Sequence, residues 1–155
     1  MNRHIDKVIN GELSHVNNPT RKDFLFRVSL KSVIFNELGD VLVVKESGRD
    51  WWDLPGGGMD HGESVHDALA RELREEVSLA CNFTYEPILV EDPRYLSDHN
   101  LYQMRLTFLV KPETLSFYPG EDGDEVKFVK PYSFKDSNLV TERKIYEYSE
   151  IAKLR

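Results

Sequence analysis

The sequence predicts an α/β fold, a sandwich in which helices pack on a mixed β-sheet. Strand-like alternation lies on both sides of one amphipathic helix, and a second amphipathic helix follows near the end of the chain. The length of 155 residues suits one domain with an ordinary core. We therefore expect residues 1–155 to form a single domain, with the polar residues 1–22 as an N-terminal appendage or a short helix.

Three stretches before the central helix predict strands, at residues 24–35, 41–44 and 51–54. In the first, Phe26, Val28 and Leu30 alternate with polar residues, which is the two-residue period of a half-buried strand. Residues 36–40 predict a hairpin turn into the second strand. The third strand is expected to be short because Pro55 ends it.

Three further stretches after the central helix predict strands, at residues 83–91, 101–110 and 126–129. The middle one is the clearest, because its apolar and polar residues alternate along its whole length. Residues 119–124 form an acidic loop. Residues 141–154 place Ile145, Tyr148 and Ile151 at helical spacing, which predicts a second amphipathic helix that packs on the sheet.

The central helix, expected over residues 64–77, carries charge in an unusual place. Its apolar stripe consists of Val65, Ala68, Leu69 and Leu73. Glu72 and Glu76 are one turn apart and fall inside this stripe, where two like charges are costly unless a cation compensates them. A divalent metal ion would do so, which makes the segment a candidate catalytic site. The alternative is a solvated acidic face on which Arg71 pairs with Glu75.

The segment over residues 54–79 resembles the Nudix box. That pattern is a glycine, five residues, a glutamate, seven residues, and then Arg-Glu-aliphatic-x-Glu-Glu-x-Gly-aliphatic. Its positions read Gly57, Glu63, Arg71, Glu72, Leu73, Glu75, Glu76, Ser78 and Leu79. Ser78 departs from the pattern, because the family has a glycine there that ends the helix in a left-handed conformation. Serine adopts this conformation only at some cost.

The resemblance implies a Nudix-type α/β/α sandwich with a central mixed β-sheet, and metal-dependent hydrolysis of a diphosphate bond. Hard divalent cations such as Mg²⁺ or Mn²⁺ shield the phosphates, polarise the attacked phosphorus and activate water. Arg71 would orient a glutamate rather than bind substrate, and Glu63 would support the site from the helix start or through metal-bound water. The metal ligands implied are Glu72 and Glu76, with contributions from Glu75, Glu63 and the carbonyl of Gly56.

The base that activates water often lies outside the box in this family, in a later loop. The acidic loop and the residue after it offer four carboxylates, Glu121, Asp122, Asp124 and Glu125. Among them we favour Glu121 and Glu125 as catalytic residues, with Glu72 as a rival base. The alternative is a charged turn that is merely solvated.

Four residues outside the box are candidates for substrate contacts. Arg49, Arg94 and Arg105 could contact phosphate or ribose, and the indole of Trp52 could stack on a nucleobase. Core packing is the alternative for Trp52.

The expected function is a metal-dependent hydrolase that cleaves the pyrophosphate bond of a nucleoside diphosphate linked to another moiety, as in a nucleoside triphosphate, an ADP-ribose-like compound or a nucleotide sugar. The alternative is a catalytically silent Nudix-like domain that binds a nucleotide or a partner. Isomerase chemistry of the isopentenyl-diphosphate kind usually needs a reactive cysteine, and the one cysteine, Cys81, has no special setting.

Composition excludes several classes of partner. The formal charge of −7 argues against a broad basic surface for nucleic acid, although not against a phosphorylated substrate.

No apolar run approaches the roughly 20 residues of a membrane span. The start of the chain lacks the apolar region of a secretory signal, so a cytoplasmic location is expected. Many relatives are dimers, so a homodimer is possible.

Overall fold

A computed structural model of the chain describes residues 5–9, 12–15, 20–21 and 23–155. Its elements are β1 (Ile5–Ile9), β2 (Glu12–His15), β3 (Asp23–Phe24), β4 (Phe26–Val33), β5 (Val41–Glu46), α1 (Val65–Val77), β6 (Phe83–Val90), β7 (Arg94–Leu96), β8 (Leu101–Pro112), β9 (Gly123–Val129), the 3-10 helix η1 (Pro131–Phe134) and α2 (Val140–Ala152).

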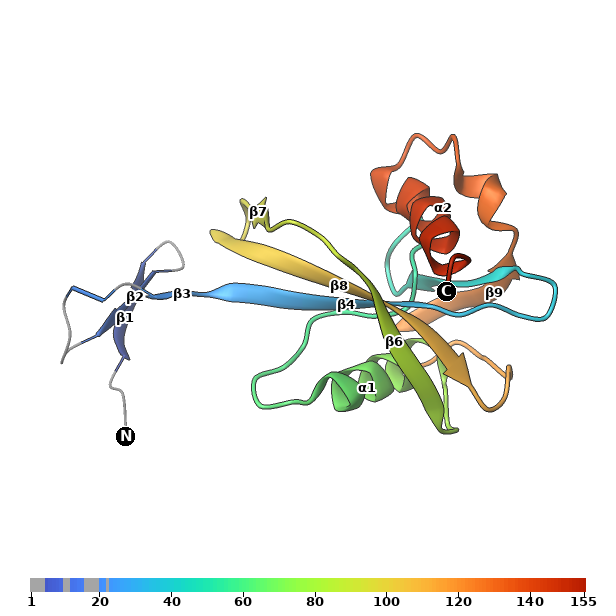
Figure 1. Cartoon of the computed structure of the whole chain (residues 1–155), viewed down its shortest axis with the longest axis horizontal. Helices are drawn as coiled ribbons and strands as arrows, with labels where there is room; N and C mark the ends of the chain where they lie inside the picture. Colours follow the sequence, from blue (N-terminus) through green and yellow to red (C-terminus); the bar gives the residue numbers. More distant parts are fainter. Residues whose placement is uncertain (1–4, 10–11, 16–19, 22) are drawn as a thin grey trace.

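Two helices enclose the β-structure from opposite sides, α1 below and α2 above in Figure 1. The larger sheet has the order β4-β8-β6, with β7 also paired to β8. It is mixed, because β4 runs parallel to β8 whereas β6 and β7 run antiparallel to it. β5 and β9 form an antiparallel pair. This architecture confirms the predicted α/β/α sandwich with a mixed sheet.

The core is divided between the two helices. Leu42 and Val44 of β5 belong to one buried cluster with Leu69 and Leu73 of α1. Their neighbours Val41 and Val43 belong to a second cluster, together with Ile145 and Tyr148 of α2. Both faces of β5 are therefore covered, which explains why this strand is a continuous apolar run in the sequence.

The glycine loop that precedes α1 runs along the edge of β4. The backbone N–H groups of Leu30 and Ser32 donate to the carbonyls of Gly57 and Pro55, both at 2.8 Å. The N–H of Met59 donates to the carbonyl of Val28 at 2.9 Å. These bonds satisfy the edge of the strand. They also hold the loop beside β4, next to its edge.

The acidic loop binds the end of α1. The backbone N–H groups of Tyr118, Gly120 and Asp122 donate to the carbonyls of Val77, Glu76 and Glu75, at 3.2, 3.0 and 2.9 Å respectively. A helix ends with carbonyls that lack intrahelical partners, and this loop supplies donors to them. A Cβ atom at Gly120 would lie 2.1 Å from the carbonyl oxygen of Glu75, so the approach requires glycine.

Several expected elements differ from those observed. Residues 51–54 form no strand, only an isolated bridge between Asp53 and Val44, because the chain turns into the glycine loop after it. The turn at residues 36–40 leads into β5 as expected, but β4 and β5 are then paired in different sheets. The short helix considered for residues 1–22 is wrong where the structure describes them, since β1 and β2 are antiparallel strands. The rest of that segment lies outside the described residues, and the division into one domain with an appendage stays a prediction.

Ser78 occupies the left-handed conformation that the family gives to glycine, with φ 55° and ψ 33°. Its N–H donates to the carbonyl of Arg74, and the N–H of Leu79 donates to that of Leu73, both at 3.1 Å. The helix therefore ends in the expected geometry, with the strain placed on serine.

We expect Ser78→Gly to raise the free energy of unfolding by about 1 kcal/mol, because glycine removes the left-handed strain. Urea denaturation followed by circular dichroism measures the change. Ser78→Ala is the matched control, since alanine keeps the Cβ atom and should give no gain. A glycine variant no more stable than the wild type would contradict this account.

Candidate functional site

A cavity of 540 Å³ lies between the glycine loop, α1 and the polar face of the β4–β8 pair. We call it the carboxylate cavity. Its charged lining residues are Glu46, Asp53, Glu72, Glu76, Asp122, Arg27, Lys31, Arg49, Arg94 and Arg105. Their mutual placement follows from strand register: Arg27 is paired with Gln103 and Ser29 with Arg105, so alternate residues of both strands share one face.

Glu76 lies at the buried end of this cavity, with only 4% of its surface exposed. Its Oε2 atom accepts a hydrogen bond of 2.8 Å from the N–H of Gly56. Burial raises the pKa of Glu76 to about 8, and the nearby glutamates 46 and 72 act in the same direction. The ionised carboxylate is therefore short of compensating positive charge.

Glu72 lines the same cavity one helical turn earlier and is 9% exposed. Burial raises its pKa, although Arg71 donates a hydrogen bond of 2.8 Å to its Oε1 atom. A Cβ atom at Gly57 would lie 2.7 Å from both carboxylate oxygens of Glu72. Glycine at this position therefore leaves the space that the carboxylate occupies.

Arg71 holds the surrounding acidic residues in place and does not line the cavity. Its guanidinium donates to both carboxylate oxygens of Glu63, at 2.7 and 3.0 Å, and to Glu75 at 3.3 Å. It also donates to the carbonyl of Gly58 at 2.9 Å. The bonds from Arg71 lower the pKa of Glu63 to about 2. This arrangement is the one expected of an orienting residue.

Lys31 is a cavity residue that the sequence analysis did not single out. It is 4% exposed, and its ammonium donates to Asp53 Oδ2 at 2.8 Å and to the carbonyl of Leu54 at 3.0 Å. Its third hydrogen bond, of 2.8 Å, is to the carbonyl of Gly56, the oxygen expected to bind metal. Lys31 falls at a polar position of an alternating strand, and that pattern predicts an exposed side chain. Its burial could therefore not be predicted from the sequence.

The other predicted residues are divided between the cavity and its surroundings. Arg49, Arg94 and Arg105, the candidates for substrate contacts, line the cavity, and so do Glu46 and Arg27, which were not among the candidates. Trp52 does not line it and packs against the core cluster of α2, with the ammonium of Lys127 4.2 Å from its ring centre.

The favoured base candidates also lie outside the cavity lining. Glu121 does not line the cavity, and neither does Glu125, which pairs with Lys45 at 3.2 Å. Asp122 is the one residue of the acidic loop that lines it. Asp124 instead binds the turn after β5, where its carboxylate accepts from Ser47 and Gly48 at 3.1 Å.

The donor set fits a magnesium-type ion that is completed by substrate. Within the described residues no three carboxylate, imidazole or thiolate groups converge into a finished metal site. Mg²⁺ does not require one, since it is usually bound by one or two carboxylates together with waters and substrate phosphates. The buried carboxylates of Glu72 and Glu76 would supply these ligands.

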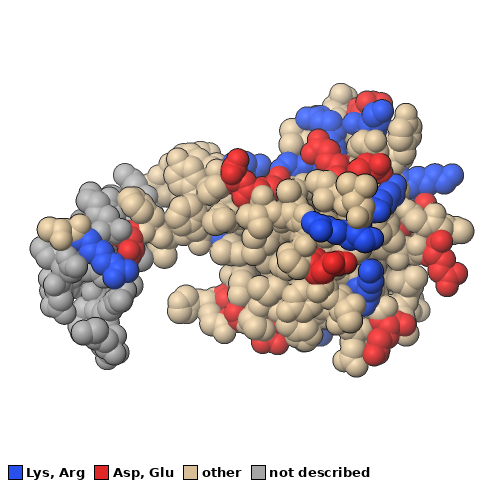
Figure 2. All heavy atoms as spheres, viewed as in Figure 1, with Lys and Arg blue, Asp and Glu red and all other residues tan. Residues whose placement is uncertain are grey.

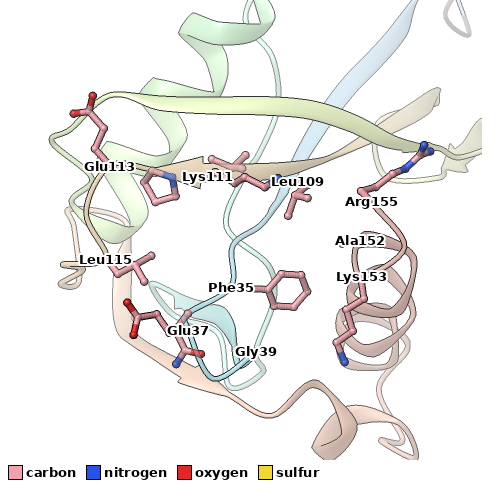
Figure 3. Close-up of a pocket in the computed structure, with 13 residues that line it drawn as sticks. Phe35, Glu37, Gly39, Leu109, Lys111, Glu113, Leu115, Ala152, Lys153 and Arg155 are labelled. Atoms are coloured by element: carbon pink, nitrogen blue, oxygen red, sulfur yellow. The ribbon is translucent and has the colours of Figure 1, made fainter.

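A larger cavity of 760 Å³ lies elsewhere, at the turn after β4 and the ends of β8 and α2. Figure 3 shows Phe35, Leu109 and Leu115 around it, with the side chains of Glu37 and Glu113 at its margin. Both of these glutamates are exposed, and no residue is shared with the carboxylate cavity. The charged residues of the larger cavity are all exposed, whereas the smaller cavity has the buried Glu72 and Glu76, which identify it as the candidate site.

Comparison with protein-family models gives a match to the NUDIX domain over residues 25–148. The chain belongs to the Nudix family. It is 44% identical over 71 residues to an RNA pyrophosphohydrolase of Ruthia magnifica, a match that covers 46% of this chain and 38% of that protein. An RNA pyrophosphohydrolase of Shewanella frigidimarina is 44% identical over 54 residues, with 35% and 31% covered. The chain thus matches less than two-fifths of the length of these relatives.

Solved Nudix-like structures share the fold at low sequence identity. A UDP-X diphosphatase aligns with a TM-score of 0.66 and 20% identity, covering 89% of this chain and 66% of that one. The E. coli ORF135 protein aligns with a TM-score of 0.65 and 19% identity, covering 84% and 93%. These likenesses confirm the fold alone.

The raised pKa of Glu76 predicts how stability depends on pH without metal. A carboxyl whose pKa is higher in the folded state loses its stabilising contribution as pH rises from the unfolded value of 4.5 to about 8. In EDTA, we expect the free energy of unfolding of the wild type to fall over this range by a few kcal/mol relative to Glu76→Gln. Denaturant titrations at a series of pH values measure the difference, and parallel pH profiles for the two proteins would refute it.

Proposed function

We propose that this Nudix protein is a metal-dependent hydrolase that cleaves the pyrophosphate bond of a nucleoside diphosphate linked to another moiety. The observation that carries the proposal is the pair of buried glutamates, 72 and 76, in a cavity that also presents Arg27, Arg49, Arg94 and Arg105. The carboxylates suit metal binding, and the guanidinium groups that line the same cavity suit phosphate.

The roles of the residues follow from their contacts. Mg²⁺ or Mn²⁺, when bound, would supply charge neutralisation for the phosphates and an activated water. Glu72 and Glu76 would hold the ion, and Arg71 would keep Glu72 aimed into the cavity through its bond of 2.8 Å. Glu63 and Glu75 would act through Arg71. The arginines of the cavity would orient the substrate phosphates.

The proton acceptor for the attacking water stays a prediction. Glu121 and Glu125 remain the candidates from sequence, and Glu72 remains their rival. Asp122 now deserves comparison with them, because it lines the carboxylate cavity and is held there by its backbone N–H bond to the carbonyl of Glu75. Separate substitutions of these four residues would distinguish them.

A second cavity supports a substrate made of two linked parts. This adjoining cavity of 510 Å³ shares Arg94, Gln103 and Arg105 with the carboxylate cavity. Its other lining residues are Leu89, Val90, Glu91, Asp92 and Lys144. The ammonium of Lys144 is hydrogen-bonded to Glu91 there. A diphosphate held by the shared arginines would therefore have space for a group on each side.

The relatives suggest one member of this substrate class. Those named RNA pyrophosphohydrolase make the 5′-phosphorylated end of an RNA a candidate, since it joins a phosphate chain to a longer polymer. Binding would be confined to the end, because basic and acidic side chains are interspersed over the body on the face drawn in Figure 2.

The remaining sequence-based expectations are a cytoplasmic location and a homodimer, and both stay predictions. Among the residues that the structure describes, no helix has the length and hydrophobicity needed to cross a membrane. The alternative function is a silent domain that binds a nucleotide or a partner. Such a domain has no need for a complete set of box glutamates, so their presence here favours the hydrolase.

The proposal is tested with a panel of nucleoside triphosphates, ADP-ribose, nucleotide sugars, dinucleotide polyphosphates and 5′-triphosphorylated RNA, with Mg²⁺ or Mn²⁺. We expect hydrolysis of at least one, and a loss of about a hundredfold or more in kcat for Glu76→Gln, because a metal ligand is removed. Mass spectrometry of products formed in ¹⁸O-labelled water measures it.

The matched control for this experiment is Glu147→Gln, which neutralises an exposed glutamate of α2 and should keep full activity. Full activity of Glu76→Gln on the identified substrate would rule out the proposed site. Nucleotide binding without turnover under every metal condition would favour the silent domain.

The two-part substrate predicts a selective effect of Lys144→Gln. Lys144 lines only the adjoining cavity, so we expect KM to rise about tenfold for two-part substrates, the cost of one charge-assisted contact, and to stay unchanged for nucleoside triphosphates. Steady-state kinetics on both substrate types measures it. Lys130→Gln, at an exposed position directly after β9, is the control. An equal rise in KM for both substrate types would argue against separate subsites.

A further inference from the structure

The ammonium of Lys31 is positioned like a bound cation. It is buried and directs its three donors at the Asp53 carboxylate and at the carbonyls of Leu54 and Gly56, with distances between 2.8 and 3.0 Å. An ammonium has three donors, so this geometry uses all of them. Lysine is rarely buried to this extent, and it is then kept by partners of opposite charge.

Gly56 connects this ammonium to the metal-binding glutamates. Its carbonyl accepts from Lys31 at 2.8 Å, and its N–H donates to Glu76 Oε2, also at 2.8 Å. The positive charge of Lys31 acts on both Glu76 and Glu72, favouring their ionised forms. Lys31 therefore lines the same cavity as the two carboxylates and contacts the glycine loop there through the carbonyl of Gly56.

Asp53 fixes the ammonium in this place. Its Oδ2 atom accepts from Lys31, while its Oδ1 atom accepts from the N–H of Leu54 at 2.7 Å. The side chain of Asp53 is 15% exposed and that of Lys31 is 5% exposed, so water screens the pair little. A divalent ion bound to the same carbonyl would lie about 2.1 Å from that oxygen, one of whose two lone pairs already accepts from the ammonium, and the two cations would repel each other.

We propose that Lys31 is a built-in cation that takes the place of one divalent metal ion at the carbonyl of Gly56. The carbonyl is then no metal ligand in this chain, and metal binds only on the cavity side of Glu72 and Glu76. Lys31 is thus a positioning residue that sets the number of ions. The inference rests on the proposed metal dependence of the site.

The test counts bound Mn²⁺ ions per chain by electron paramagnetic resonance, without substrate and with the full-length protein. The double variant Lys31→Met/Asp53→Asn removes both members of this ion pair together, so neither is left buried without the other. We expect it to bind one Mn²⁺ ion more than the wild type, because the carbonyl of Gly56 is released. The same number of ions as in the wild type overturns the proposal.

Asp53→Asn alone is the matched control. It keeps the ammonium and leaves an amide oxygen for it to contact, so the wild-type number of ions is expected. A gain of one ion in this control also overturns the proposal, since the gain would not depend on the ammonium. Should the double variant fail to fold by circular dichroism, Lys31→Gln gives the same count with the charge removed and the same outcomes.

Glu76→Gln in the same titration separates this inference from the proposed function. Retention of every bound ion in that variant would show that Glu76 binds no metal, and the proposed metal site would fail. Loss of an ion in Glu76→Gln, combined with no gain in the double variant, would leave the hydrolase intact and refute only the role of Lys31.

Discussion

The guanidinium of Arg71 is the interaction on which the arrangement of the site depends. It joins the carboxylates of Glu63, Glu72 and Glu75 to the carbonyl of Gly58, and so connects the glycine loop to α1. Its planar set of donors suits several oxygens at once, and few other side chains have that capacity. Arg71 contributes no surface to the cavity, so its contacts there are with other protein groups that surround it.

The second constraint is the cost of burying negative charge in the core-facing stripe of a helix. Arg71 compensates Glu72 on the outer side, and the N–H of Gly56 stabilises Glu76 on the inner side. This compensation is incomplete, because burial still raises the pKa of both carboxylates. A site that remains short of positive charge favours the approach of cations, which is the physical basis of the proposed metal binding.

What the sequence could predict was local in character. The positions of Glu72 and Glu76 followed from the 3.6-residue period of one helix, and the structure buries both. The opposite wall of the cavity depends on the parallel pairing of β4 with β8, which joins distant segments and leaves no local signal. The orientation of Trp52 could not be predicted from the sequence either, because the strand pattern was compatible with an indole in the core and with one facing a substrate. Lys31 is buried by a loop that covers the edge of its strand. The alternation of residues along the strand gives no information about such a loop.

The acidic loop and the β7 region differ in how directly hydrogen bonds connect them to α1. Two backbone hydrogen bonds from the acidic loop, and a third from Tyr118 directly before it, join this segment to the last carbonyls of α1, and Gly120 permits this contact. The β7 strand, which carries Arg94, is paired only with β8 among the described strands. A change of length in the acidic loop would disturb the glutamates, whereas one near β7 would not. The wall of the cavity that carries Arg94 can therefore be altered in shape independently of the helix that carries Glu72 and Glu76.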